Sequence, residues 1–152
     1  MNPQTTRSGA NYIVAELGEI TDWKAYTAEV AALPGVQVPG KFFLHPVLGL
    51  TGMEISINCM PAKGKVPFFH RHKEHEEVYL FLSGHGQFQI DGEIVEIRPG
   101  TALCVRPEGA RTWRNNSDGD LYYIVIQATA GSLRTPGTED GQPKPGKPEW
   151  PV

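Results

Sequence analysis

The sequence predicts an all-β fold, an antiparallel sandwich or barrel, built as a single domain of 152 residues. From residue 41 onward, about eight short apolar or alternating segments follow one another, and turn residues separate them at intervals of roughly 8–12 residues. In addition, 17 glycines and 13 prolines interrupt any long helix, which excludes a helical bundle. Hydrophobic residues still make up 39% of the chain, enough for one core.

Residues 1–40 are predicted to form an extension with a short helix. Residues 1–10 are polar and are expected to fray, and residues 11–17 are predicted to form a short strand. Asp22 can cap a helix that runs to about Leu33, where a Pro-Gly pair ends it.

The barrel itself is predicted over residues 41–130. Asp91-Gly92 is typical of a tight type I′ turn and would join two strands in a hairpin. Residues 131–152 carry five of the thirteen prolines, which cannot donate to a ladder, so an extended arm or a disordered tail is expected there. The strands are expected at residues 41–44, 53–60, 66–72, 76–82, 86–90, 93–97, 101–105, 112–116 and 121–127.

Charge and apolar patterning exclude two classes of partner. With 14 basic and 17 acidic residues the net charge is −3, so the basic footprint of a nucleic-acid-binding protein is absent. No apolar run approaches the roughly 18 residues of a membrane span, and the first residues lack the apolar stretch of a signal peptide. We therefore expect a cytoplasmic protein with two buried, reduced thiols at Cys59 and Cys104.

Four of the five histidines fall between residues 70 and 85. His70 and His72 stand two positions apart, so on a strand both side chains project from the same face. A turn at residues 73–76 would bring Glu77 beside them on the adjacent strand. Two imidazoles and one carboxylate on one face can hold a divalent transition metal and leave other coordination positions open.

Glycines bound this cluster at fixed spacing. The order is Gly64, five residues, His70-x-His72, four residues, Glu77, six residues and Gly84. This string resembles, without a gap, the first signature motif of the cupin family (cupin 2, conserved β-barrel). The resemblance implies a jelly-roll barrel, the double-stranded β-helix, with one divalent metal (Zn, Fe, Mn or Ni) held by the two histidines and the glutamate.

The second cupin motif is only partly present after Gly100. The place of its histidine, the usual fourth metal ligand, is taken by Arg111 or, if one residue is inserted, by Thr112. Trp113 is the apolar residue of this segment and should face the barrel interior. Arg111 and Asn115 lie an even number of residues from Trp113, so on a strand they share its face, whereas Thr112 points to the opposite face. This favours Arg111 in the histidine position. In either alignment the fourth ligand is missing.

Three roles are open for Arg111, because a guanidinium stays protonated and cannot bind a metal. It could grip the carboxylate or phosphate of a substrate. The site could instead have lost its metal and bind an acidic ligand directly. Finally, the side chain could point out of the mouth and pair with a surface carboxylate.

Further candidates surround the predicted triad. Tyr79 and Phe81 share the parity of the glutamate and are expected to line the cavity with Trp113 and Asn115, as substrate contacts or, for the first two, equally as core. His75 is a candidate extra ligand, because the fourth histidine is absent.

The other side of the same strand is apolar as well. Val78, Leu80 and Leu82 point away from the cavity, so this face needs cover from the N-terminal segment or from a second subunit. The family resemblance favours a homodimer.

The function predicted from these features is that of a metalloenzyme acting on a small polar or anionic molecule. A sugar-phosphate-type isomerase and a dioxygenase both suit a site of two histidines and one carboxylate. The alternative is a non-catalytic small-ligand-binding or sensor cupin that has lost the fourth metal ligand. The fold by itself leaves the reaction open, because one fold hosts many reactions.

Overall fold

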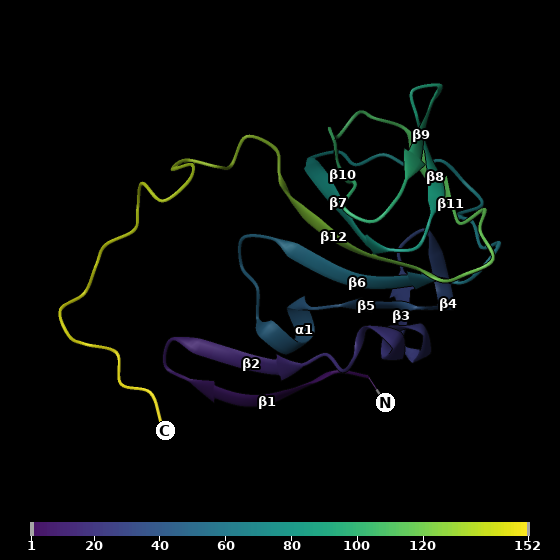
Figure 1. The fold of residues 1–152 in the computed structure, drawn as a ribbon. Coiled ribbons are helices and arrows are strands. Elements are labelled where there is room, and N and C mark those ends of the chain that lie inside the picture. Colours follow the sequence, from purple (N-terminus) through teal and green to yellow (C-terminus); the bar gives the residue numbers. More distant parts are fainter. Residues whose placement is uncertain (1, 152) are drawn as a thin grey trace.

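A computed structural model describes residues 2–151 of the chain. Its elements are β1 (Gln4–Gly9), β2 (Tyr12–Glu16), the 3-10 helix η1 (Ile20–Ala25), β3 (Thr27–Val30), β4 (Leu33–Pro39), β5 (Lys41–Phe43), α1 (His45–Leu48), β6 (Glu54–Met60), β7 (His75–Ser83), β8 (Gly86–Ile90), β9 (Glu93–Ile97), β10 (Ala102–Val105), β11 (Arg111–Arg114) and β12 (Leu121–Thr129). A larger sheet has the order β10-β7-β12-β6-β5, and a smaller one has the order β11-β8-β9 (Figure 1). The hairpins β1–β2 and β3–β4 precede them.

One apolar cluster fills the space between the two sheets. Tyr79 and Phe81 of β7 pair with Val125 and Tyr123 of β12 in an antiparallel ladder. All four side chains belong to this interior cluster, together with Phe88 of the smaller sheet. The all-β barrel predicted from strand spacing is therefore confirmed.

A second apolar cluster lies on the outer face of the larger sheet. Trp23 and Tyr26, in and next to η1, pack there against Ile57, Cys59 and Tyr122. β6 and β12 therefore carry apolar side chains on both faces, and the N-terminal segment covers part of the outer one.

The predicted helix over residues 22–33 is wrong beyond Ala25. The helix that forms is the short 3-10 helix η1, and the residues after it pair as the hairpin β3–β4. Helix propensities differ by less than about 1 kcal/mol per residue, so the hairpin ladder and the burial of Trp23 and Tyr26 outweigh them. Residues 4–9, expected to fray, form β1, which pairs with β2.

Within the barrel the other predicted strands are present, with one exception. The segment 66–72 makes one isolated bridge, between His70 and Arg111, and Lys65 just before it makes another. Pro67 interrupts the segment and cannot donate to a ladder. Cys104 is exposed, contrary to expectation, because it lies on the edge strand β10. From residue 131 to residue 151 the chain has no strand, and it leaves the barrel as an exposed arm (Figure 1). No described helix is long and apolar enough to cross a membrane.

Candidate metal centre

The two histidines of the motif lie between β6 and β7, against the start of β11. The backbone N–H of His70 donates to the carbonyl of Arg111 at 3.1 Å, and the N–H of Arg111 donates back to His70 at 3.0 Å. The N–H of His72 donates to the carbonyl of Pro107 at 3.1 Å. These bonds fix both residues at the barrel edge without a continuous strand.

The three residues of the predicted triad converge. His72 Nε2 lies 3.1 Å from Glu77 Oε1, and His70 Nε2 lies 3.8 Å from Glu77 Oε2. One ligand atom from each residue lies within 4.8 Å of the other two. Metal–ligand bonds of about 2.0–2.2 Å place two ligands of one ion at most roughly 4 Å apart, so small side-chain rotations suffice to bind one ion. The His70 and His72 side chains are 26% and 28% exposed, so solvent reaches them.

Unpaired polar atoms at this place fit a divalent metal. His70 Nδ1 and His72 Nε2 are buried and have no hydrogen-bond partner among the described residues. Glu77 Oε1 faces His72 Nε2 and accepts no hydrogen bond within residues 2–151. Buried polar atoms are usually paired, and coordination of an ion would satisfy the histidine nitrogen and the carboxylate oxygen together.

The other carboxylate oxygen of Glu77 is held by the protein. Oε2 accepts hydrogen bonds from the hydroxyl of Tyr79 and from the guanidinium of Arg111, each at 2.5 Å. Burial by itself would raise the pKa of Glu77, but contacts with the two histidines, Arg111 and Tyr79 outweigh burial and hold that pKa well below its usual range. The carboxylate therefore stays ionised, as a metal ligand must.

Arg111 points into the barrel and is fully buried. Besides its bond to Glu77, the guanidinium donates to the carbonyl of Gly109 at 2.9 Å and, through Nε, to the Tyr79 hydroxyl at 3.5 Å. Burial lowers the pKa of Arg111, but the bonds to Glu77 and Tyr79 outweigh it and raise that pKa. The interpretation in which Arg111 points out of the mouth is wrong. Each of its three nitrogen atoms donates one hydrogen bond to a protein group, and the side chain is fully buried, so the geometry favours orientation of the carboxylate over a grip on substrate.

Aromatic side chains pack next to the triad. The ring of Trp113 lies 5.9 Å from that of His70 and 5.1 Å from that of Tyr79, measured between centroids. Phe81 lies behind Tyr79 in the interior cluster, at 6.5 Å. Trp113, which is half-buried, is therefore placed next to the triad, whereas Tyr79 and Phe81 are both buried in the core. A substrate contact for these residues stays a prediction.

Asn115 is buried and fully used within the loop that follows β11. Its amide nitrogen donates to the carbonyls of Met60, Pro61 and Gly119, at 2.7–3.0 Å. Its carbonyl oxygen accepts bonds from the backbone and hydroxyl of Ser117. These bonds leave nothing for a ligand, so the predicted substrate contact of Asn115 is not supported.

His75 opens β7, and its ring centroid lies 6.0 Å from that of His72. It is not one of the three residues whose ligand atoms converge. Its role as an extra ligand stays a prediction.

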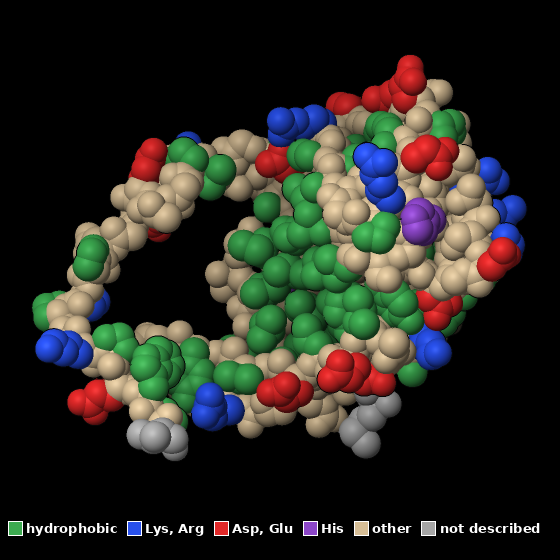
Figure 2. All heavy atoms as spheres, viewed as in Figure 1, with side chains coloured by type: hydrophobic (Ala, Val, Ile, Leu, Met, Phe, Trp, Pro, Cys, Tyr) green, Lys and Arg blue, Asp and Glu red, His purple; other side chains and the backbone are tan. Residues whose placement is uncertain are grey.

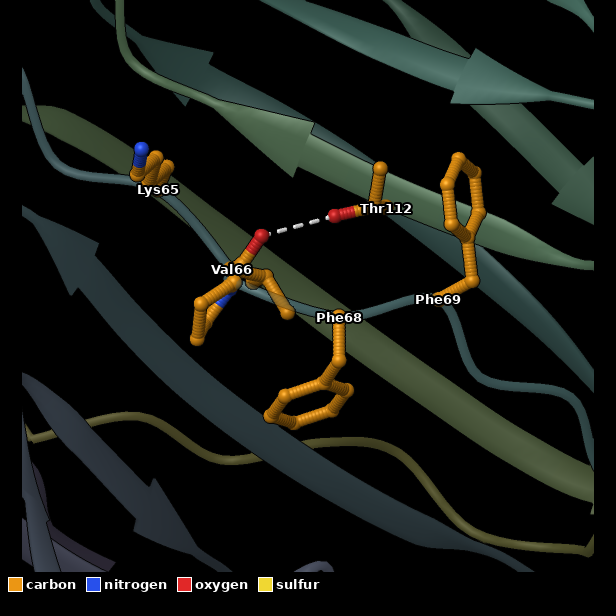
Figure 3. Close-up of a pocket in the computed structure, with 6 residues that line it drawn as sticks. Lys65, Val66, Phe68, Phe69 and Thr112 are labelled. Carbon is orange, nitrogen blue, oxygen red and sulfur yellow. Dashed lines mark hydrogen bonds between the residues drawn. The ribbon is translucent and has the colours of Figure 1, made fainter.

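The pockets at the surface lie beside the triad. In one of about 220 Å³, the segment Lys65–Phe69 faces Thr112, whose hydroxyl donates to the carbonyl of Val66 at 2.9 Å (Figure 3). Another, of about 270 Å³, lies along β8 and β9. No residue of the triad lines either pocket. Thr112 thus faces this outer pocket, and Arg111 takes the interior position.

One polar group inside the barrel was missed by sequence reasoning. Lys41 Nζ donates to Ser56 Oγ at 3.1 Å and to Asn58 Oδ1 at 2.9 Å. The available signal was a charged residue at the start of an apolar strand, next to a strand in which serine and asparagine alternate with apolar residues.

Comparisons with known proteins agree with this architecture. The profile of the family described as cupin domain matches residues 57–127. The crystal structure of a cupin protein from Bacteroides fragilis is 38% identical with a TM-score of 0.66, and the match covers 78% of this chain and 97% of that one.

Two more distant structures share the fold. One is named as a predicted oxalate decarboxylase from Thermotoga maritima (18% identity, TM-score 0.53, 70% of this chain and 94% of that one). The name of the other proposes a sugar phosphate isomerase, from Acidithiobacillus ferrooxidans (23% identity, TM-score 0.59, 72% and 70%). No curated protein matches the chain. The barrel, the histidine motif and the similarity to the Bacteroides protein, matched over nearly its whole length, show that the chain belongs to the cupin family.

Proposed function

We propose that this cupin binds one divalent transition metal (Zn, Fe, Mn or Ni) through His70, His72 and Glu77. We further propose that it is a metalloenzyme acting on a small polar or anionic molecule. The observation that carries this proposal is the convergence of His72 Nε2, which has no hydrogen-bond partner among the described residues, and Glu77 Oε1, 3.1 Å apart, beside the second histidine.

The residues around the triad would orient its ligand atoms for metal binding. Arg111 and Tyr79 hold Oε2 of Glu77, which keeps Oε1 turned towards the histidines. Trp113 and Tyr79 pack against each other next to the triad, with 5.1 Å between their ring centroids. A divalent metal at three protein ligands supplies a Lewis acid with open positions or, as iron, a site for dioxygen. An isomerase and a dioxygenase are the two reaction types that this donor set supports.

The ion pair between Arg111 and Glu77 favours a second candidate, a non-catalytic ligand-binding or sensor cupin. The guanidinium neutralises the carboxylate, so the pair needs no metal to compensate the buried charge. The usual fourth ligand is replaced by the residue that makes this pair. Such a protein would bind a small ligand without turning it over.

Elemental analysis of the protein purified without added metal tests the metal site. We expect about one metal ion per chain in the wild type and none in His70→Ala/His72→Ala, because two of the three ligands are gone. The matched control is His45→Ala/His85→Ala, which removes two exposed histidines away from the triad and should keep the metal. A wild type that holds no metal, even after incubation with each of the four ions, would refute metal binding and leave the sensor candidate.

We also propose that a second copy of the chain covers the outer face of β7. Val78 and Leu80 are half-buried there and Leu82 is 42% exposed. Figure 2 shows hydrophobic side chains gathered over β7, β12 and β6, beyond the part that the N-terminal segment covers. An exposed apolar patch of this kind is typical of a protein interface.

Light scattering measures the subunit number. The wild type is expected at twice the chain mass of 16.7 kDa, and Leu82→Glu should shift it towards the monomer, because a charge would be buried in the interface. Ile94→Glu is the control, since Ile94 is 54% exposed on the smaller sheet. A wild type that stays monomeric at tens of micromolar would show that the β7 face is not a dimer contact.

A cytoplasmic location remains part of the proposal. Both cysteines are free, and Cys104 is exposed. An exposed free thiol persists best in a reducing compartment, which supports the cytoplasm.

A further inference from the structure

A lysine projects from the edge strand β5 towards the barrel interior. Lys41 pairs with Asn58 of β6. Asn58 and Ser56 pair in turn with Tyr123 and Val125 of β12, which belong to the interior cluster. Residues opposite each other in a ladder share a face of the sheet. Lys41, Ser56 and Asn58 therefore all point to the same side as the aromatic core.

Two hydrogen-bond donors of this group have no acceptor within residues 2–151. The Lys41 ammonium has three N–H bonds, and two of them go to Ser56 and Asn58. Ser56 Oγ accepts from Lys41 and also from Asn58 Nδ2, at 3.0 Å, which occupies both of its lone pairs. The serine hydrogen is therefore free to donate, as is the third hydrogen of the ammonium.

Among residues 2–151, the groups in direct contact with the Lys41 ammonium are neutral: besides its two hydrogen bonds, Nζ lies 4.8 Å from the centre of the Phe43 ring. None of the ion pairs among the described residues includes this ammonium. Glu77 is paired with Arg111 instead, and those two charges cancel. Lys41 therefore has no carboxylate in direct contact, although Glu77 and Glu54 act on its charge from a greater distance. A desolvated charge held only by neutral groups is costly, and a bound anion would neutralise it.

Electrostatics support the same conclusion. Burial lowers the pKa of Lys41 to about 8, although the carboxylates of Glu77 and Glu54 act to raise it. The influence of Glu77 on Lys41 means that the ammonium lies within electrostatic reach of the triad. At pH 7 the lysine is still protonated.

We propose that Lys41, Ser56 and Asn58 form the binding site for the anionic group of this protein's small-molecule ligand, a carboxylate or a phosphate. The ammonium supplies the charge, the serine hydroxyl supplies a second hydrogen bond, and Asn58 holds both in place. Binding of a substrate anion was one of the three roles left open for Arg111; the fully buried Arg111 is paired with Glu77, so we assign this role to Lys41 instead. The link to a metal-bound substrate rests on the function proposed above, but the anion site itself does not require the metal.

Nuclear magnetic resonance on the metal-free, chelator-treated protein tests the site. Inorganic phosphate and, separately, acetate are titrated while the backbone amides of residues 41 and 56–58 are followed. We expect saturable shifts in the wild type and an affinity about ten- to hundredfold weaker in Lys41→Met, because a charge-assisted bond is lost. Lys24→Met, which removes an exposed lysine from η1, should bind like the wild type. Response to phosphate alone or to acetate alone assigns the ligand class, and either supports the site.

Further variants and a pH titration distinguish a loss of binding from a loss of folding. Lys41→Arg keeps the charge and should retain most of the binding, whereas Ser56→Ala should weaken it less than Lys41→Met does. Acetate binding should also fade as the pH rises above about 8, where Lys41 loses its proton while Glu77 and Glu54 stay ionised. Absence of saturable shifts with both anions, or equal affinity in wild type and Lys41→Met, would overturn the assignment.

Metal content separates this site from the metal centre. Lys41→Met should hold as much metal as the wild type by elemental analysis. If the wild type binds anions through Lys41 but holds no metal, the metalloenzyme proposal fails and the anion site stands. If the metal is present and the lysine substitution leaves anion affinity unchanged, only the anion site is refuted.

Discussion

Arg111→Met is expected to lower the free energy of unfolding of the metal-free protein by about 3–5 kcal/mol. The guanidinium is fully buried and bonded to Glu77, so the substitution leaves a buried carboxylate without its counter-ion. Methionine keeps much of the length of the side chain and removes only the charge and the donors. Urea denaturation in the presence of a chelator, followed by tryptophan fluorescence, measures the change.

Arg114→Met is the matched control, because it removes an arginine from the same strand. Arg114 is exposed, and within residues 2–151 its guanidinium bonds only to the side chain of Gln87, so its loss should change stability by less than about 0.5 kcal/mol. If Arg111→Met lowers the free energy of unfolding as little as Arg114→Met does, Arg111 does not form a buried ion pair in solution. Its role in orienting Glu77 would then have to be abandoned.

Glu77→Gln is expected to have two large effects. It removes a metal ligand, so metal content should fall from about one ion per chain to nearly none. It also leaves the Arg111 guanidinium buried without a negative partner, which should lower the free energy of unfolding by about 3–5 kcal/mol even in metal-free protein. Elemental analysis and urea denaturation measure the two effects separately.

A double-mutant cycle connects these variants. Glu77→Gln/Arg111→Met removes both buried charges. We therefore expect its free energy of unfolding to be at least as high as that of the less stable of the two single variants. If the two losses of stability simply add, the side chains do not act as a pair. Retention of metal in Glu77→Gln would show that the ion binds elsewhere.

Local chemistry explains why much of the barrel could be predicted. Asp91 and Gly92 have φ values of 49° and 82°, as their type I′ turn requires, and few other residue pairs adopt that geometry. Alternation along a strand likewise places Tyr79 on the face of Glu77 and Arg111 on the face of Trp113. Such features depend on residues that are close in sequence.

Contacts between distant segments explain what could not be predicted. Arg111 finds its partner 34 residues earlier in the chain, and strand parity gives the side it faces but not the group it meets. Residues 27–30 include good helix formers and yet pair with β4, because a ladder and a covered sheet outweigh small differences in propensity. The position of Lys41 could not be predicted for the same reason, since its hydrogen-bond partners on β6 lie 15 and 17 residues away.

The apolar cluster on the outer face of the larger sheet bears on where the cooperative folding unit of this protein begins. The region that matches the family profile starts at residue 57, and the N-terminal residues were predicted to be an extension of the barrel. Trp23 and Tyr26 nevertheless complete a second core with Ile57 and Tyr122. A chain shortened to the family region would turn these strand residues towards water. The start of the family profile therefore falls inside this second core, and we expect the N-terminal segment to unfold together with the barrel that it covers.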